Sequence, residues 1–488
     1  MYRIHVMPAD KEIYAEGGEN LLALLRQHKL APDAPCGGNG KCGKCRVVIN
    51  GAEALACRTE VNCDAEVIIS SATGAAILTA SNEEYSVYNP IAPGYSACFD
   101  IGTTTVVCYL LNADDGSEIC SAAALNPQRV YGADVISRIQ SAVSDTAGAQ
   151  AELIRSCMEG LISECCEKSG IAPADVGTLS VVGNPCMQQL FMGIDTKNLA
   201  AVPFSPKIVS EDIIPAAPYI SICPEAVLTL VPDISGYVGA DTVACILSTG
   251  MYRTEKTVLM VDIGTNGEMV LSHNGRLAAC STAAGPALEG ANIRFGMRGA
   301  EGAIDRVEYK NGSFSCHVIG DSEAAGICGT GLVDAVSEAL KAGIINRRGR
   351  ISSGDEIDGE RIIKLSDAVY LTQNDIREFQ LAKGAISTGI SLLARHFGIG
   401  LEEIDEVLLA GAFGSYMNPA SAVGTGLIPR ELKGKIRPVG NAAGAGAKAI
   451  ARDRDNLALC GKLARMTEFI ELADEPDFEK QFAKNMYL

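Results

Sequence analysis

A chain of 488 residues and 51.1 kDa is too long for one compact core, so the sequence predicts two or three domains. Hydrophobic residues make up 47% of the chain and charged residues 20%, a composition that excludes an intrinsically disordered protein. The net charge of −18 argues against a nucleic-acid-binding protein, because surfaces that bind nucleic acids are basic.

The cysteine content and the N-terminal residues together indicate that the protein works in a reducing compartment of the cell. The chain opens without the apolar run of a secretion signal, and no stretch approaches 18 uninterrupted apolar residues, so we expect neither export nor membrane insertion. Eighteen cysteines without such a signal indicate a reducing compartment, where thiols bind metals or fill small core positions. We therefore expect a cytoplasmic protein with no membrane partner and no nucleic acid partner.

The first eighty residues are predicted to form a small α+β domain. Alternating apolar residues predict strands over 2–7 and 11–15, and leucines at helical spacing predict a helix over 19–30. Two further strands are expected at 46–50 and 67–70. A β-grasp ferredoxin places its cluster loop after such a helix, so the order of these elements agrees with that fold.

Four cysteines in this region stand out by their spacing of C-x5-C-x2-C-x11-C: Cys36, Cys42, Cys45 and Cys57. Plant-type 2Fe–2S ferredoxins use a C-x4-C-x2-C run followed by a fourth cysteine. The loop also contains glycines that permit the positive φ values needed to turn N–H groups towards cluster sulfides: Gly37, Gly38, Gly40 and Gly43. These features predict a 2Fe–2S cluster on the four cysteines.

Two alternatives stay open for this module. Four cysteines can also hold a structural zinc ion, although zinc sites usually pair two short CxxC segments. Cys63 competes with Cys57 as the fourth ligand, because eleven residues between the third and fourth cysteine is a short spacing for this type. Most other cysteines stand singly among apolar residues, as Cys108 and Cys245 do, and are predicted core residues.

Residues 81–94 form a predicted polar linker, and a repeated motif follows it. Each copy has an apolar strand, an Asp-x-Gly-Thr turn and a second apolar strand, and the two aspartates, Asp100 and Asp262, are 162 residues apart. A repeat over this distance predicts a duplicated domain. We place ATPase subdomain I at 95–250 and subdomain II at 251–488.

Turns of Gly and Thr offer N–H groups and hydroxyls to phosphate oxygens, and an Asp at a strand end can orient Mg²⁺. The predicted catalytic residues are therefore Asp100 and Asp262. The predicted phosphate-binding residues are those of the two turns: Gly102, Thr103, Thr104, Thr105, Gly264, Thr265, Asn266, Gly267 and Glu268.

Further glycine-rich segments follow in the order expected for a nucleotide cleft. A strand enters a turn at 179–185, a connecting helix is predicted within 235–247, and a close helix–strand contact is expected at 440–446. Glycine turns elsewhere supply more predicted cofactor-binding residues: Gly285, Gly329, Thr330, Gly331, Gly411 and Gly414. The chain contains no Gly-x-x-x-x-Gly-Lys-Ser/Thr motif, which excludes a P-loop ATPase.

The paired turns resemble those of the actin, Hsp70 and sugar-kinase superfamily, and the whole chain resembles the reductive activators of corrinoid proteins. The run from Gly285 to Gly302 is the most specific part, since generic sugar kinases lack it. The resemblance implies a ferredoxin-type β-grasp domain followed by an α/β actin-like ATPase of the duplicated RNase H-like type. Longer relatives carry a middle domain between the two halves, and the short linker here leaves no room for one.

What the resemblance implies about function is a repair reaction. An activator of this family passes one electron from its 2Fe–2S cluster to an inactive Co(II) corrinoid protein and restores Co(I) in a methyltransferase system, with ATP and Mg²⁺ coupled to the step. The implied partners are the corrinoid protein and a low-potential electron donor. The oligomeric state stays open, with a homodimer among the options.

Two other functions remain as alternatives. One is a small-molecule kinase with a redox-sensing ferredoxin domain. The other is an activator that delivers low-potential electrons to another metalloenzyme, such as a 2-hydroxyacyl-CoA dehydratase.

Four basic residues frame the cysteine loop: Lys41, Lys44, Arg46 and Arg58. Residues 1–80 have a net charge of −1, so the rest of the chain carries −17. These cations either solvate the loop or guide the N-terminal domain onto an acidic surface, which belongs to an electron donor or to the chain's own body.

Overall fold

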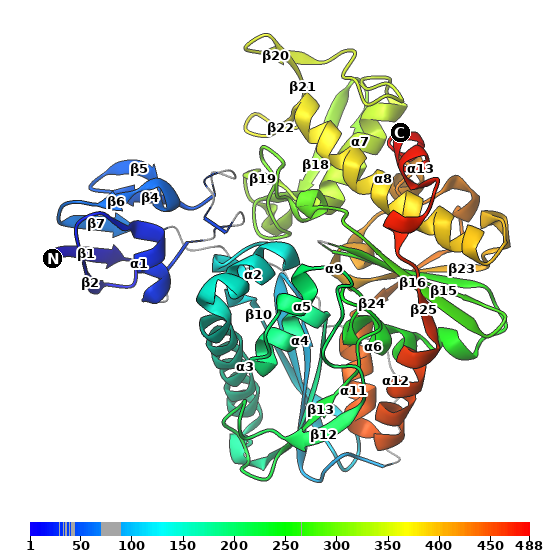
Figure 1. Ribbon diagram of the computed structural model, residues 1–488. Helices are drawn as coiled ribbons and strands as arrows, with labels where there is room; N and C mark the ends of the chain where they lie inside the picture. Colours follow the sequence, from blue (N-terminus) through cyan, green and yellow to red (C-terminus); the bar gives the residue numbers. More distant parts are fainter. Residues whose placement is uncertain are drawn as a thin grey trace.

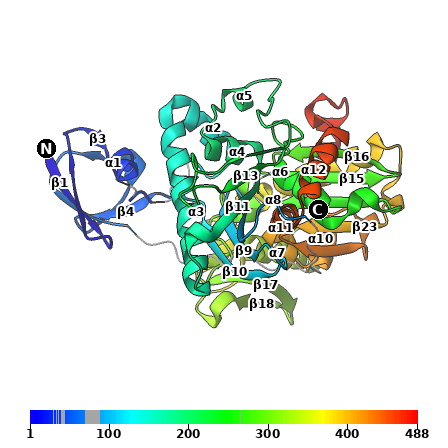
Figure 2. The same ribbon diagram turned by 90° about the horizontal axis from the view of Figure 1, so that it is seen from below.

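The computed structural model describes residues 1–28, 30–32, 34, 37–38, 40, 44–69, 89–264 and 266–488. They form a small N-terminal domain and a larger body of two lobes. Two perpendicular views place the N-terminal domain to one side of the body, next to the helices α2 (Val135–Ser141) and α3 (Ala147–Ser169) of the first lobe (Figures 1 and 2). No described helix is both long enough and apolar enough to cross a membrane.

The N-terminal domain is a five-stranded mixed sheet packed against one helix. The strands lie in the order β2-β1-β7-β4-β5, and only β1 and β7 pair in parallel. Helix α1 (Leu21–Gln27) buries its leucines in the core of this domain. It is shorter than the sequence predicts, because Glu19–Asn20 forms the strand β3 and the Asn20 side chain caps the helix. The remaining elements are β1 Tyr2–Met7, β2 Lys11–Ala15, β4 Arg46–Ile49, β5 Ala52–Leu55, η1 Ala56–Arg58, β6 Glu60–Val61 and β7 Ala65–Ile68.

The first lobe is built on a six-stranded sheet in the order β10-β9-β8-β11-β13-β12. Strands β8, β9 and β10 form an antiparallel meander, while β11 and β13 join β8 in parallel. The bounds are β8 Tyr95–Ile101, β9 Thr105–Asn112, β10 Glu118–Leu125, η2 Pro127–Val130, β11 Val176–Gly183, α4 Pro185–Met192, α5 Lys197–Ala200, β12 Asp212–Pro215, β13 Val227–Leu230 and α6 Ala240–Thr249.

The second lobe repeats this topology. Its sheet has the order β24-β23-β14-β15-β16-β25, in which β14, β15 and β16 form the antiparallel meander and β23 and β24 join in parallel. The bounds are β14 Val258–Ile263, β15 Gly267–His273, β16 Arg276–Thr282, η6 Pro286–Glu289, α8 Gln373–His396, β23 Glu406–Ala410, α9 Gly411–Tyr416, α10 Pro419–Gly424, β24 Ile436–Gly440, α11 Ala442–Arg452, α12 Arg454–Met466, β25 Thr467–Phe469 and α13 Phe478–Asn485.

The two lobes share one core through the helices α6 and α11. Buried side chains of both sheets and of these helices belong to a single hydrophobic cluster. A Cβ atom built on Gly446 of α11 would lie 2.3 Å from the Ala244 carbonyl oxygen of α6, so only glycine permits this close crossing. The equivalent positions of β8 and β14 confirm the duplication, and the arrangement agrees with the actin-like fold that the resemblance implied.

Small strands extend the second lobe. A sheet of β17 (Ala303–Lys310), β18 (Ser313–Val318) and β19 (Gly326–Ile327) packs on helix α7 (Gly329–Lys341). A second small sheet has the strands β20 Asp355–Ile357, β21 Glu360–Lys364 and β22 Tyr370–Leu371. Figure 1 shows β20, β21 and β22 at the end of the second lobe that lies away from the first lobe.

The predicted linker, 81–94, is described only in its last part. Residues 81–88 lie outside the described residues. Residue Asn89 forms a bridge to Asp453, and the Arg454 side chain donates a 3.0 Å hydrogen bond to the Ile91 carbonyl oxygen. The segment that leads into β8 is therefore bound to the C-terminal helices of the body.

Candidate functional site

A cavity of about 470 Å³ lies in the cleft between the two lobes. Both Asp-x-Gly turns line it, one at the end of β8 and one at the end of β14, because the duplication places them at equivalent strand ends. The predicted residues that line this cavity are Asp100, Gly102, Thr103, Thr104, Thr105, Asp262, Gly264, Asn266, Glu268, Gly329, Thr330 and Gly411.

Other predicted residues have a different position. Thr265 lies outside the described residues. Gly267, Gly285, Gly331 and Gly414 do not line the cavity. A Cβ on Gly331 would lie 2.2 Å from the Ile304 carbonyl oxygen, and one on Gly414 would lie 3.1 Å from the Leu409 side chain. These two glycines allow close packing beneath the cleft.

Side chains of the first lobe hold the first turn in place. The Asn126 side chain donates a 2.8 Å hydrogen bond to the Gly102 carbonyl oxygen, and Asn184 donates one of 3.1 Å to the Thr103 hydroxyl. The buried guanidinium of Arg138 donates to the Thr103 carbonyl oxygen. The turn is thus fixed from below while its hydroxyls stay on the cavity side.

The second turn is packed against the strand–helix junction of β23 and α9. Gly411 has a φ of +77°, and a Cβ built on it would lie 2.5 Å from the Asp262 Oδ1 atom. Gly329 is equally restricted, since its Cβ would lie 1.8 Å from the Leu288 carbonyl oxygen. Each glycine therefore lets a backbone segment approach the cavity where a side chain would block it.

The cavity is strongly acidic. Burial, followed by the charge of Asp241, raises the pKa of Asp100 to about 7 and the pKa of Asp262 to about 7. Burial also raises the pKa of Asp241 to about 6. Burial and the charges of Asp241 and Asp262 raise the pKa of Glu268 well above its usual range. Such a group of carboxylates is stabilised by protons or by a bound cation.

No three His, Cys, Asp or Glu side chains among the described residues are placed to hold a metal ion on their own. In nucleotide sites Mg²⁺ usually takes one or two carboxylates and completes its shell with phosphate oxygens and water. The carboxylates and turn hydroxyls of this cleft fit a Mg²⁺–nucleotide complex of that kind.

Sequence reasoning missed several residues that line the cavity, among them Asp241, Glu289 and Asn441. Asp241 lies in the first turn of α6, which approaches the cleft because Gly239 packs against the backbone of Asn184. The Glu289 carboxylate accepts a 3.0 Å hydrogen bond from the Thr104 hydroxyl of the other lobe. All three residues lie in segments that the sequence analysis identified, but those segments were recognised by their glycines or as a predicted helix and not by these polar side chains.

The described glycines of the cysteine loop have the backbone conformation that the sequence predicts. Gly37, Gly38 and Gly40 all have the positive φ values that the sequence predicted, at +67°, +98° and +70°. Cys36, Cys42 and Gly43 lie outside the described residues. Cys45 is buried directly before β4, and its carbonyl oxygen accepts a 2.9 Å hydrogen bond from the backbone N–H of Ala56, the neighbour of Cys57. The hairpin β4–β5 thus brings Cys45 and Cys57 together.

Cys63 lies elsewhere in this domain. It is exposed, and it precedes β7, which runs antiparallel to β4 with Val48 opposite Ile68. This register places Cys63 and Cys45 at opposite ends of the sheet. A cluster held by Cys45 would therefore be distant from the Cys63 thiol.

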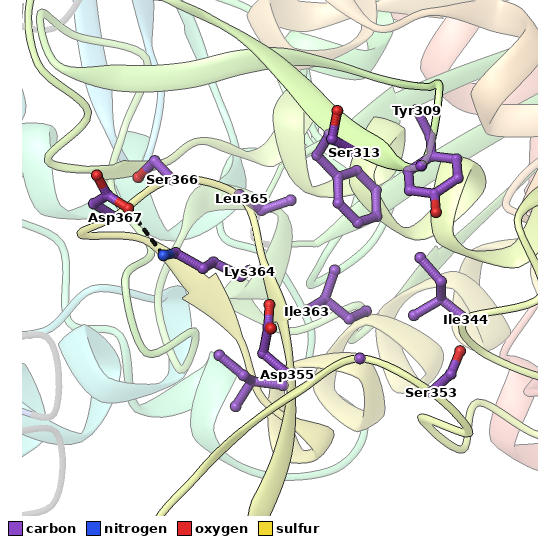
Figure 3. A pocket seen from close by; sticks show the side chains of 14 residues that line it. Tyr309, Ser313, Ile344, Ser353, Asp355, Ile363, Lys364, Leu365, Ser366 and Asp367 are labelled. Carbon is purple, nitrogen blue, oxygen red and sulfur yellow. Dashed lines mark ion pairs between the residues drawn. The ribbon is translucent and has the colours of Figure 1, made fainter.

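A second cavity, of about 690 Å³, lies outside the cleft (Figure 3). It is lined by Tyr309 of β17, by Ser313 of β18 and by residues of β21 and its flanking loops, where Lys364 forms a 2.9 Å ion pair with Asp367. None of the sequence-predicted site residues lines this cavity.

Comparison with protein-family models finds two adjoining matches. Residues 95–254 match the RACo middle region, and residues 256–488 match the C-terminal ASKHA domain of RACo. The expectation that the middle domain of longer relatives is missing is therefore wrong, because the first lobe matches the model of that region.

Individual relatives agree with the family match. The chain is 36% identical over 420 residues to the corrinoid activation enzyme RamQ of Eubacterium limosum, covering 80% of this chain and 70% of that protein. It is 27% identical over 398 residues to the Co(II) methylated amine-specific corrinoid protein reductase of Methanosarcina barkeri, covering 74% and 71%. A solved reductive activator for a corrinoid iron–sulfur protein aligns with all of this chain and 98% of its own, with 25% identity and a TM-score of 0.73.

Proposed function

Since the chain belongs to the RACo family, we propose that it is an ATP-dependent reductive activator of a corrinoid protein. It passes one electron to cobalt, which goes from Co(II) to Co(I), and an external low-potential donor then replaces that electron. The observation that carries the proposal is the presence, in one chain, of a glycine-rich cysteine loop and of a cleft with two carboxylate-bearing turns. The similarity of this chain to the corrinoid activation proteins described above supports the same reaction.

The cleft is the proposed site of one Mg²⁺–ATP. Asp100 and Asp262 would orient the cation, and the hydroxyls of Thr103 and Thr104 would bind phosphate oxygens, since all four residues line the cavity. Bound Mg²⁺ supplies the positive charge that stabilises the acidic cleft and the phosphates together. Phe413 and Tyr416 also line the cavity and offer an apolar wall to the base.

The cysteine loop is the proposed site of the cluster, on Cys36, Cys42, Cys45 and Cys57. A 2Fe–2S cluster there would accept and release one electron at a time. Clusters of the plant type have potentials near roughly −400 mV, and for one electron each ~59 mV below that potential is a tenfold equilibrium penalty. Coupling to ATP can offset such a penalty only through a nucleotide state that binds the partner differently.

The assay for this function mixes the reduced protein with a Co(II) corrinoid protein and follows the visible spectrum of the corrinoid. Loss of the Co(II) bands and growth of the Co(I) band should require both ATP and Mg²⁺. ATP turnover that is indifferent to the corrinoid protein, with phosphate transferred to a small molecule, would favour the kinase alternative instead.

Cluster type and ligands can be tested separately. Two iron and two sulfide ions per chain are expected, whereas four shared between two chains would favour the dehydratase-activator alternative. We expect Cys57→Ala to bleach or destabilise the cluster and Cys63→Ala to leave the visible spectrum unchanged, because the β4–β5 hairpin places Cys57 near Cys45. The reverse result would assign the fourth ligand to Cys63.

A further inference from the structure

Among the described residues, the N-terminal domain contacts both lobes of the body. In the first lobe, the Arg26 guanidinium of α1 lies over the Tyr131 ring, 5.3 Å from its centre. In the second lobe, the Lys44 ammonium group lies 3.5 Å from the Gly296 carbonyl oxygen, to which it donates. The first is a cation–π contact, and the second is a hydrogen bond to a backbone carbonyl oxygen.

The first contact also involves the cysteine loop. A Cβ atom built on Gly37 would lie 3.3 Å from the Tyr131 carbonyl oxygen, and one built on Gly38 would lie 3.7 Å from both terminal guanidinium nitrogens of Arg26. Gly37 directly follows Cys36 in the sequence. Gly37 therefore lies directly against the body, and the Arg26 side chain contacts both Gly38 and the Tyr131 ring.

The Tyr131 contact is connected to the first phosphate turn by a short series of hydrogen bonds. Tyr131 follows η2, whose N-cap residue Asn126 donates to the Gly102 carbonyl oxygen. The next residue, Gly132, accepts a 2.9 Å hydrogen bond from Arg138, and the same guanidinium donates to the Thr103 carbonyl oxygen. A shift of this turn would thus be transmitted to Tyr131.

The Gly296 contact is connected to the second lobe's side of the cavity. Gly296 is followed directly by three residues that line the cavity, Met297, Arg298 and Gly299. A Cβ atom on Gly296 would lie 2.0 Å from the Gly290 carbonyl oxygen, so this segment packs tightly against the residue that follows Glu289. Movement of Glu289 would therefore displace the Gly296 contact as well.

The Thr104–Glu289 hydrogen bond joins the two lobes across the cavity, at 3.0 Å. A nucleotide phosphate that binds the Thr104 hydroxyl competes with the Glu289 carboxylate for the same group. Loss of this bond would change the spacing between Tyr131 and Gly296, and one rigid domain cannot keep both contacts when that spacing changes.

We propose that the N-terminal domain docks on both lobes at the rim of the cleft, and that nucleotide binding in the cleft releases it. The docked domain keeps its cysteine loop against the body, and release makes the loop available to the corrinoid protein. This inference rests on the proposed nucleotide site.

The absence of tryptophan from the chain permits a direct test. Tyr131→Trp introduces a single indole at the contact, where Tyr131 is only 8% exposed. The matched control is Tyr219→Trp, because Arg155 lies over the Tyr219 ring at 5.2 Å within the first lobe alone. The probe is the magnesium complex of AMPPNP, and calorimetry on the unsubstituted protein establishes whether it binds.

In Tyr131→Trp we expect Mg–AMPPNP to shift the emission to the red and to increase quenching by iodide, with no change in Tyr219→Trp. Adding Arg26→Gln to Tyr131→Trp should produce a smaller shift in the same direction without nucleotide. Arg26→Gln should lower the ratio of docked to undocked N-terminal domain about two- to fivefold, because this is the contribution expected of one cation–π contact. Arg3→Gln, which removes an exposed pair with Glu12 on the same domain, should change nothing.

Small-angle X-ray scattering of the unsubstituted protein provides a second measurement that does not depend on the folding of any variant. The maximum dimension should increase when Mg–AMPPNP is added, and Arg26→Gln should show a smaller increase without nucleotide. An Arg26→Gln protein indistinguishable from the unsubstituted one would overturn the docking contact. If calorimetry shows binding while emission and scattering stay unchanged, the release is wrong although the nucleotide site stands. Absence of binding would overturn both the nucleotide site and the release.

Discussion

The turn after β8 and the turn after β14 occupy equivalent places in two lobes of the same topology, yet their surroundings differ. Across the strand pair, Asp100 faces Val107, whereas Asp262 faces Glu268. The first turn is held by hydrogen bonds from Asn126, Arg138 and Asn184, whereas the second is packed against Gly411.

We propose that this difference gives the two turns, which share one strand pattern, separate roles. The first turn is fixed by its own lobe and presents hydroxyls, so it suits phosphate binding. The second turn adds a second carboxylate to the cleft, so it suits the cation. The two lobes thus keep the same strand order, while the residues beside each turn differ and give the turns different functional groups.

The largest effect is expected from removing the charge of the second turn. Asp262→Asn should lower Mg²⁺-dependent ATP turnover by about 100-fold or more, because the orientation of a metal ion is worth several kcal/mol. Asp100→Asn should also lower the rate of ATP turnover, but it should raise the Mg²⁺ concentration needed for half-maximal turnover less than Asp262→Asn does. Asp233→Asn is the control, a buried carboxylate with a raised pKa that does not line the cavity. Equal Mg²⁺ requirements for the two turn variants would contradict the division of roles.

Gly411→Ala should be the next most damaging change. The added Cβ would lie 2.5 Å from Asp262 Oδ1, so it should displace the Asp262 carboxylate. The φ of +77° at this position adds backbone strain of about 1–3 kcal/mol, which lowers the free energy of unfolding. Thermal unfolding and nucleotide binding measure the two parts. Gly434→Ala is the matched control, because Gly434 has a φ of +80° and no atom within 4 Å of its Cβ position. If both variants bind nucleotide equally well, the contact with Asp262 has no functional role.

Asn126→Ala tests how the first turn is held. Asn126 is fully buried, and its side chain donates to Gly102 and accepts from the Gln128 backbone, so its loss leaves buried polar groups unsatisfied at about 1–3 kcal/mol. Chemical denaturation should show this loss, together with weaker nucleotide binding. Asn112→Ala, which removes only an exposed turn contact to Asp114, should cost less than about 0.5 kcal/mol.

A graded effect is expected from pH. Asp100 and Asp262 have pKa values of about 7 and must lose their protons before a cation binds, so Mg²⁺–nucleotide affinity should rise about tenfold per proton released as the pH increases from about 6 to about 8. Without nucleotide, the free energy of unfolding should change with pH in the opposite direction to the binding affinity. A folded-state pKa above the unfolded value makes stability fall as pH rises from about 4 to about 7. Titration calorimetry and thermal unfolding across this range would show both trends, and a flat binding profile would contradict the raised pKa values.

Local patterns in the sequence were sufficient for the elements and for much of the cleft. The strands Tyr2–Met7 and Lys11–Ala15 coincide with their predicted ranges, because alternation of apolar residues is a property of near neighbours. The repeated Asp-x-Gly turns were recognisable for the same reason, and most of their residues line the cavity.

Tertiary structure decided which distant residues complete the site. Asp241, Glu289 and Asn441 come from three segments far apart in the chain, and an Asp or Asn at the start of a helix is common enough to carry no functional signal by itself. The packing of α6 and α11 between the two sheets brings Asp241 and Asn441 to the turns, whereas Glu289 of η6 meets the first turn across the cavity. Gly331 and Gly414 instead pack against Ile304 and Leu409, outside the cavity. The sequence could not show this, because a glycine that binds a phosphate and a glycine that allows a close backbone contact have the same sequence pattern.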